Sequence, residues 1–95
     1  MPTYQIANVN VHDAEGFAEY GAQAGAMVER YGGRYLVRGG ALQVLEGDWA
    51  PTRLVVIEWE SPEHMRRWYE SDEYRAIADI RQRCADTDLV LVEGL

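Results

Sequence analysis

Two segments of the chain are apolar at consecutive positions, without the polar alternation of a strand that has one face in water. They are Leu54–Ile57 and Leu89–Val92. Unbroken hydrophobicity in a strand indicates burial on both faces of its sheet. A chain of 95 residues can cover one face with its own helices, so we expect a second copy to cover the other. The pattern therefore predicts a homodimer that forms through the sheet faces.

The periods of apolar and polar residues predict four strands and two helical regions. In chain order they are a strand over Thr3–Val11, a helix over Ala14–Tyr31, strands over Arg34–Glu46 and Arg53–Glu60, two helices end to end that begin at Ser61 and Ser71, and a strand over Leu89–Glu93. The order β-α-β-β-α-β predicts an α+β, ferredoxin-like fold with a four-stranded antiparallel sheet and the helices on one face. We expect a single domain over residues 1–95.

Glycine and helix-capping residues mark the boundaries of these elements. Ser61 and Ser71 each precede an acidic first turn, as helix starts do. The pair Gly39-Gly40 has two interpretations, a bend in one long strand or a two-residue hairpin turn, and we favour the bend. The stronger turn signal is Gly47–Thr52, which predicts the connection to the next strand.

Charge and cysteine content exclude several classes of function. The formal net charge of −7 opposes binding to nucleic acid, whose phosphates attract basic proteins. Cys84 is the single cysteine, so no intrachain disulfide and no cysteine-pair metal site can form. The sequence shows neither a signal peptide nor an apolar stretch of membrane-spanning length. We expect a cytoplasmic protein that needs no membrane.

Several segments together resemble a bacterial family of domains of unknown function, number 1330. They are Tyr31–Gly40, Leu45–Trp49, Trp68–Ser71, Tyr74 and Val92–Gly94. The resemblance implies a dimeric α+β barrel, in which two ferredoxin-like subunits pack sheet against sheet, and it implies no established activity. The wider superfamily includes cofactor-free monooxygenases, lactone isomerases, haem-degrading enzymes and stress-responsive proteins, so fold analogy alone assigns no function.

Polar residues inside the predicted strands are the first candidates for a site, because burying them is costly unless they find partners. They are Asn8, Asn10, Arg34, Arg38 and Glu58. Strand alternation puts the two asparagines on one face and the two arginines on one face. If these faces coincide, the arginines could clamp a small organic acid. The alternative is an ion-pair network that fixes strand register or the dimer interface.

The second helical region supplies the other candidates. His64 and Trp68 are four residues apart, with Tyr69 next to Trp68, so a titratable imidazole could face an aromatic wall. His64 would then act as a general base; the alternative is an exposed histidine in the first turn of a helix. Haem-degrading relatives use a first-strand asparagine and a helical histidine, which invites comparison with Asn8 and His64. His64 begins its helical region rather than lying late in it, so the match is poor, and the sequence has no metal-binding spacing. We expect no cofactor.

Two hypotheses for the function follow. In the first, the homodimer binds a small anionic or aromatic metabolite and carries out cofactor-independent proton transfer or oxygenation. His64 and Glu58 are then the candidate catalytic residues, and the candidate ligand-binding residues are Asn8, Arg34, Arg38, Trp68 and Tyr69. In the second, the protein is a noncatalytic dimeric module, structural or stress-related, without a small-molecule site. The sequence leaves open whether the protein is an enzyme.

Overall fold

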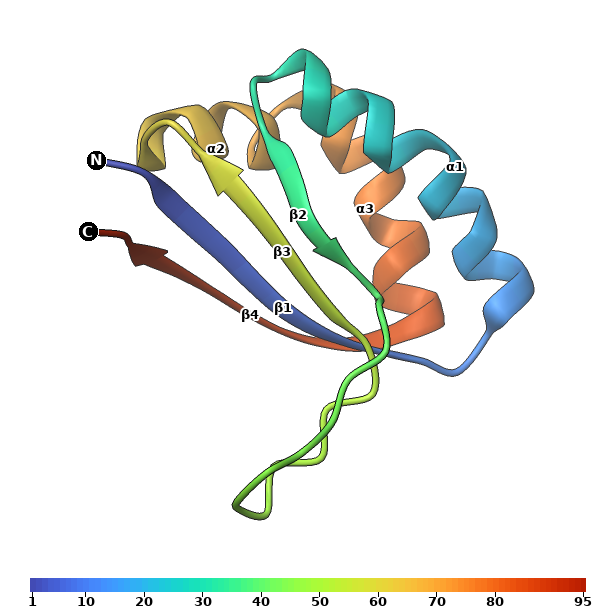
Figure 1. Ribbon diagram of the computed structural model, residues 1–95. Coiled ribbons are helices and arrows are strands. Elements are labelled where there is room, and N and C mark those ends of the chain that lie inside the picture. Colours follow the sequence, from blue (N-terminus) through green and yellow to red (C-terminus); the bar gives the residue numbers. More distant parts are fainter.

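The computed structural model, which describes all residues from Met1 to Leu95, shows four strands and three helices. In chain order they are β1 (Thr3–Val11), α1 (Ala14–Arg30), β2 (Arg34–Arg38), β3 (Leu54–Trp59), α2 (Pro62–Tyr69), α3 (Asp72–Cys84) and β4 (Ala85–Glu93). The strands form one antiparallel sheet in the order β2-β3-β1-β4. All three helices lie on one face of this sheet (Figure 1). The predicted ferredoxin-like α+β fold is confirmed.

Local signals in the sequence set the helix starts. Asp13, Ser61 and Ser71 are the N-caps of α1, α2 and α3, and each side chain accepts a hydrogen bond from a backbone N–H in the first turn. Such caps satisfy donors that the helix itself leaves free. The two end-to-end helices expected after Ser61 and Ser71 are therefore confirmed. None of the three helices is long and apolar enough to cross a membrane.

The main core lies between the helices and the inner face of the sheet. Alternate residues of β1 are buried there: Thr3, Gln5, Ala7 and Val9. The centre of the core is a pair of tryptophans, Trp59 of β3 and Trp68 of α2, whose ring centroids are 5.5 Å apart. Both are almost fully buried. The opposite face of the sheet has no helix over it.

The segment between β2 and β3 differs from the prediction. β2 ends at Arg38, and Gly39 has φ +73°, a left-handed conformation that favours glycine. Residues 40–52 make no backbone–backbone hydrogen bond and project from the sheet as an extended arm (Figure 1). The expected bend inside one long strand is wrong, because the chain leaves the sheet at Gly39. Trp49, near the end of the arm, is 61% exposed.

β4 also differs from the prediction, since it begins at Ala85 rather than Leu89. Asp86, Thr87 and Asp88 pair with the end of β1. A polar Asp-Thr-Asp sequence resembles a loop, but here its backbone completes the edge of the sheet.

A β-bulge in β2 changes which face its side chains occupy. Arg34 pairs with Glu58 and Tyr35 with Ile57, but Val37 then pairs with Val56, so Leu36 is an extra residue. One extra residue reverses the alternation beyond it. Arg34 therefore lies on the open face, whereas Arg38 pairs with Val55 on the helix-covered side. The expectation that Arg34 and Arg38 share a face is wrong.

Two glycine substitutions test how tightly the core is packed. A Cβ at buried Gly33 would lie 2.6 Å from Cγ1 of Val28 and 2.8 Å from Cη2 of Trp59. We expect Gly33→Ala to lower the free energy of unfolding by about 1–3 kcal/mol, because the core must shift to admit the methyl group. Gly21→Ala, in the middle of α1 with no atom within 4 Å of the added Cβ, should raise it by about 1 kcal/mol. Urea titrations at matched protein concentration measure both; equal stability of Gly33→Ala and wild type would contradict this packing.

Candidate functional site

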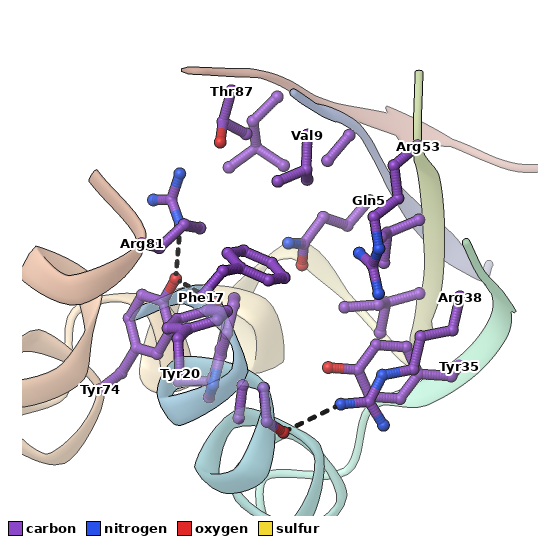
Figure 2. Close-up of a pocket in the computed structure, with 17 residues that line it drawn as sticks. Gln5, Val9, Phe17, Tyr20, Tyr35, Arg38, Arg53, Tyr74, Arg81 and Thr87 are labelled. Carbon is purple, nitrogen blue, oxygen red and sulfur yellow. Dashed lines mark hydrogen bonds between the residues drawn. The ribbon is translucent and has the colours of Figure 1, made fainter. Parts of the chain in front are cut away.

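A cavity lies between the sheet and the helices, next to the tryptophan pair (Figure 2). All four strands and all three helices contribute to its walls. The space inside it that the centre of a water-sized sphere can occupy is about 60 Å³. That is room for several water molecules or for part of a small ligand, since one water needs about 10–15 Å³ on this measure. Its lining residues are Gln5, Ala7, Val9, Phe17, Tyr20, Gly21, Ala24, Tyr35, Arg38, Arg53, Val55, Ile57, Trp68, Tyr74, Arg81, Thr87 and Leu89.

The charge of this cavity is opposite to that of the protein. Three arginines line it, Arg38, Arg53 and Arg81, and no aspartate or glutamate does. None of the three forms a salt bridge with a carboxylate. A protein with a net charge of −7 thus places three arginines without carboxylate partners around one cavity, where Arg53 and Arg81 are half-buried and Arg38 is exposed. Guanidinium groups bind anions through charge-assisted hydrogen bonds, so this arrangement favours an anionic ligand.

Aromatic rings and carbonyl groups hold the arginines in position. The Arg38 guanidinium lies 4.5 Å from the centroid of the Tyr35 ring and donates from Nη2 to the Gly21 carbonyl oxygen at 3.1 Å. Arg53 lies over the Phe17 ring at 5.4 Å. Cation–π contacts of this kind orient a guanidinium without neutralising it. The arginines therefore keep their capacity to bind an anion.

Glycine in α1 makes the position of Arg38 possible. A Cβ at Gly25 would lie 2.8 Å from Nη1 of Arg38, so the absent side chain leaves room for the guanidinium against the helix. The helical glycine at position 25, costly for helix formation, has this structural explanation, whereas the Gly21 oxygen that accepts from Arg38 is a backbone carbonyl and does not require glycine.

A hydrogen-bonded group of phenols and an arginine forms another wall of the cavity. The hydroxyl oxygens of Tyr20 and Tyr74 are 2.8 Å apart, and Arg81 donates from Nε to the Tyr74 hydroxyl at 3.3 Å (Figure 2). Burial, followed by the proximity of Tyr74, raises the pKa of Tyr20 above its ordinary value. Burial also raises the pKa of Tyr35. Both phenols therefore stay protonated at neutral pH and can act as hydrogen-bond donors rather than bases.

Three of the residues predicted for the site lie on the open face of the sheet instead. Glu58 accepts hydrogen bonds from Arg34, at 2.7 Å from Nη2, and from the Tyr4 hydroxyl at 3.3 Å. Asn8 accepts from the backbone N–H groups of Thr52 and Arg53 and so anchors the base of the arm. These contacts match the structural alternative, in which polar strand residues fix register, and they do not include Arg38.

The residues predicted on α2 divide between the surface and the core. His64 Nδ1 lies 2.7 Å from the Ser61 hydroxyl, and Nε2 lies 3.5 Å from a carboxylate oxygen of Glu60. His64 does not line the cavity. Trp68 is buried in the core, 2% exposed, and does line it, whereas Tyr69 is 37% exposed on the outside. Of the seven predicted site residues, the structure brings only Arg38 and Trp68 to the cavity.

Sequence reasoning missed most of the cavity. Tyr20 and Tyr74 lie at helical spacing among apolar residues, and Arg81 lies among charged residues of a helix, so their sequence context is that of ordinary core and surface positions. Gln5 is a polar residue inside a predicted strand, and this signal could have identified it. Arg53 lies at the boundary of a predicted strand, where a charged residue is unremarkable.

Comparison with known proteins places the chain in a family and identifies its fold. The sequence profile described as Domain of unknown function (DUF1330) matches residues 2–95. The protein belongs to this family. The resemblance to family 1330 seen in the sequence is therefore confirmed. A search of functionally curated proteins finds no match to this DUF1330 chain.

Solved structures with the same fold include proteins with and without a described activity. A protein of unknown function from Rhodopseudomonas palustris superposes with a TM-score of 0.78 at 22% identity, covering 99% of this chain and 82% of that chain. SnoaB, a cofactor-independent oxygenase from Streptomyces nogalater, superposes with a TM-score of 0.74 at 15% identity, covering 99% and 93%. A protein of the ethyl tert-butyl ether d (ethd) family from Bacillus halodurans superposes with a TM-score of 0.60 at 16% identity, covering 100% of this chain and 100% of that chain. At these identities the likeness shows the fold alone.

The raised pKa of Tyr20 predicts how stability depends on pH. Above the ordinary pKa of 10.0, the unfolded chain loses the Tyr20 proton while the folded chain keeps it. The folded state then binds more protons, so stability is complete below pH 10 and falls as the pH rises above it. We expect Tyr20→Phe to flatten this fall by up to about 1.4 kcal/mol per pH unit. Urea unfolding at several pH values on either side of 10 measures the free energy of unfolding as a function of pH. The same pH dependence in Tyr20→Phe and in wild type would contradict the raised pKa of Tyr20.

Proposed function

We propose that this DUF1330 protein binds a small anionic aromatic metabolite in the cavity between its sheet and its helices. One observation supports this most directly: three arginines without carboxylate partners line a cavity whose other walls are largely aromatic and aliphatic. Guanidinium groups bind carboxylates and phenolates through paired hydrogen bonds. A flat ring would contact the Phe17 and Tyr35 side chains. Of the ligand-binding residues predicted from the sequence, Arg38 and Trp68 keep that role in this proposal.

Oxidation of the bound ring by dioxygen is the reaction that we propose for this site. The fold shared with SnoaB, a cofactor-independent oxygenase, supports it by analogy. A dihydroxy aromatic anion can supply all four electrons that O₂ accepts. One oxygen atom replaces a ring hydrogen as a hydroxyl group, the two original hydroxyls become quinone carbonyls, and the other oxygen atom leaves as water with the two hydrogens released.

The contribution of the protein to this reaction is electrostatic. Positive charge from Arg38 and Arg53 favours the phenolate over the phenol, and the anion transfers an electron to O₂ more readily. Preorganised groups of this kind stabilise developing charge without reorganisation. No lining residue is a histidine or a carboxylate, so the substrate must lose its proton to water or enter as the anion. His64 and Glu58, the predicted catalytic residues, therefore take no part in the proposed reaction at this site.

We further propose that a second copy of the chain covers the open face of the sheet. Val37, Val56, Ile6 and Val90 are register partners across all four strands and form an apolar row on that face. Val90 is 58% exposed. The next row contains Arg34, Glu58 and Tyr4 in a hydrogen-bonded group. A symmetric dimer would bury the apolar row and use the polar row to set the register.

Ligand binding can be tested by thermal denaturation with benzoate, 4-hydroxybenzoate and 2,5-dihydroxybenzoate. A ligand at ten times its Kd stabilises the native state by about 1.4 kcal/mol, which raises the Tm of a domain of this size by roughly 5–10 °C. We expect Arg53→Met to abolish the rise. Arg67→Met is the matched control, because Arg67 is exposed and lines no part of the cavity.

Oxygen consumption with 2,5-dihydroxybenzoate then tests the reaction, with heat-denatured protein as the control for spontaneous oxidation. Binding without oxygen consumption above that control would support a binding protein and contradict the oxygenase. A flat thermal response to all three acids would overturn the proposed site.

The covering of the open face can be tested by sedimentation velocity. We expect wild type to sediment as a dimer and Val90→Asp to sediment as a monomer, because an unpaired carboxylate would have to be buried in the apolar row. Leu95→Asp adds the same charge at a fully exposed terminal position and should leave the dimer intact. A monomeric wild type would contradict the proposed interface.

A further inference from the structure

The amide of Gln5 is held in one orientation by the core. Its Oε1 accepts a hydrogen bond from Nε1 of Trp59 at 2.9 Å. An indole N–H can only donate, so the carbonyl end of the amide must face it. The Nε2 end of Gln5 therefore points the other way, and Figure 2 shows the amide reaching from β1 into the cavity. Gln5 is 6% exposed, and no acceptor of the protein bonds its Nε2.

The indole N–H of Trp68 is not a second donor to the cavity. Its Nε1 has no hydrogen-bond partner and no accessible surface, because aromatic rings pack against Trp68 on several sides. Buried donors are satisfied in the great majority of native structures, and one without a partner calls for an explanation. For Gln5 Nε2, which faces the cavity, that explanation is an acceptor that the ligand brings.

The other polar groups of the cavity do not supply that acceptor. The Tyr20 and Tyr74 hydroxyls bond each other, and Arg81 donates to Tyr74. The lining residues include no carboxylate and no histidine. The Thr87 hydroxyl, which is buried without a partner, does not bond Gln5. A ligand that carries an acceptor oxygen complements the free Gln5 donor.

We propose that Gln5 Nε2 binds a carbonyl oxygen of the ligand, so that the site selects aromatic acids that also carry a carbonyl or quinone group. The inference rests on the proposed function, which supplies the anionic aromatic ligand. The acid group of the ligand meets Arg53, and the carbonyl oxygen lies at the Gln5 end. In the proposed oxidation this oxygen is one that changes from hydroxyl to carbonyl, so the same donor binds the product.

A pair of probes that differ in one oxygen tests the proposal. 4-Acetylbenzoate carries a ketone where 4-ethylbenzoate has a methylene, and both have the same carboxylate and the same ring. We expect wild type to bind 4-acetylbenzoate about tenfold more tightly by isothermal titration calorimetry. Equal affinities would overturn the carbonyl site while leaving the anionic aromatic site in place, and absence of binding by both would overturn the two proposals together.

A variant assigns the selectivity to Gln5. Gln5→Glu keeps an oxygen for Trp59 but presents an acceptor to the cavity, so it should reverse the preference toward 4-ethylbenzoate. Arg53→Met is the matched control, expected to weaken both probes by a similar factor and to leave their ratio unchanged. An unchanged ratio in folded Gln5→Glu would contradict the assignment, and the wild-type comparison decides the case if this variant fails to fold.

Discussion

A single sheet with helices on only one of its faces is the constraint on which the rest of this structure depends. The helix-covered face carries the core, with Trp59 and Trp68 at its centre, and it also encloses the cavity. The open face carries an apolar row across the strands, with Val90 more than half exposed. A strand such as β3 serves both faces at once, which is why its sequence is apolar at consecutive positions. The proposed ligand site and the proposed dimer interface therefore lie on opposite sides of the same four strands.

The bulge in β2 separates two groups of charges that would otherwise meet. Before Leu36, Arg34 points to the open face and pairs with Glu58; after it, Arg38 points to the cavity. Without the extra residue, Arg38 would share the open face with Glu58, and the cavity would lose one of its three guanidinium groups. Bulges often redirect side chains near functional sites, and here the redirected side chain lines the candidate site.

Local signals made much of the fold predictable, and long-range contacts account for what was not. The caps at Asp13, Ser61 and Ser71 act within one helical turn, so the helix starts could be found from the sequence. The bulge is a property of the pairing between β2 and β3, and the segment Arg34–Arg38 alternates equally well without it. Gln5 depends on Trp59, 54 residues away. The candidate site was predicted poorly because its residues converge only after all four strands are in register.

The contrast between the acidic surface and the cationic cavity limits which ligands the cavity can hold. At an effective dielectric constant near 20, a unit charge 4 Å from an opposite one gains about 4 kcal/mol, so arginines without carboxylate partners attract an anionic ligand. Aromatic contacts from Tyr35 and Phe17 orient Arg38 and Arg53 without neutralising them. A neutral ligand of the same shape would gain the apolar contacts without this attraction. The proposed site therefore distinguishes ligands by charge before it distinguishes them by shape.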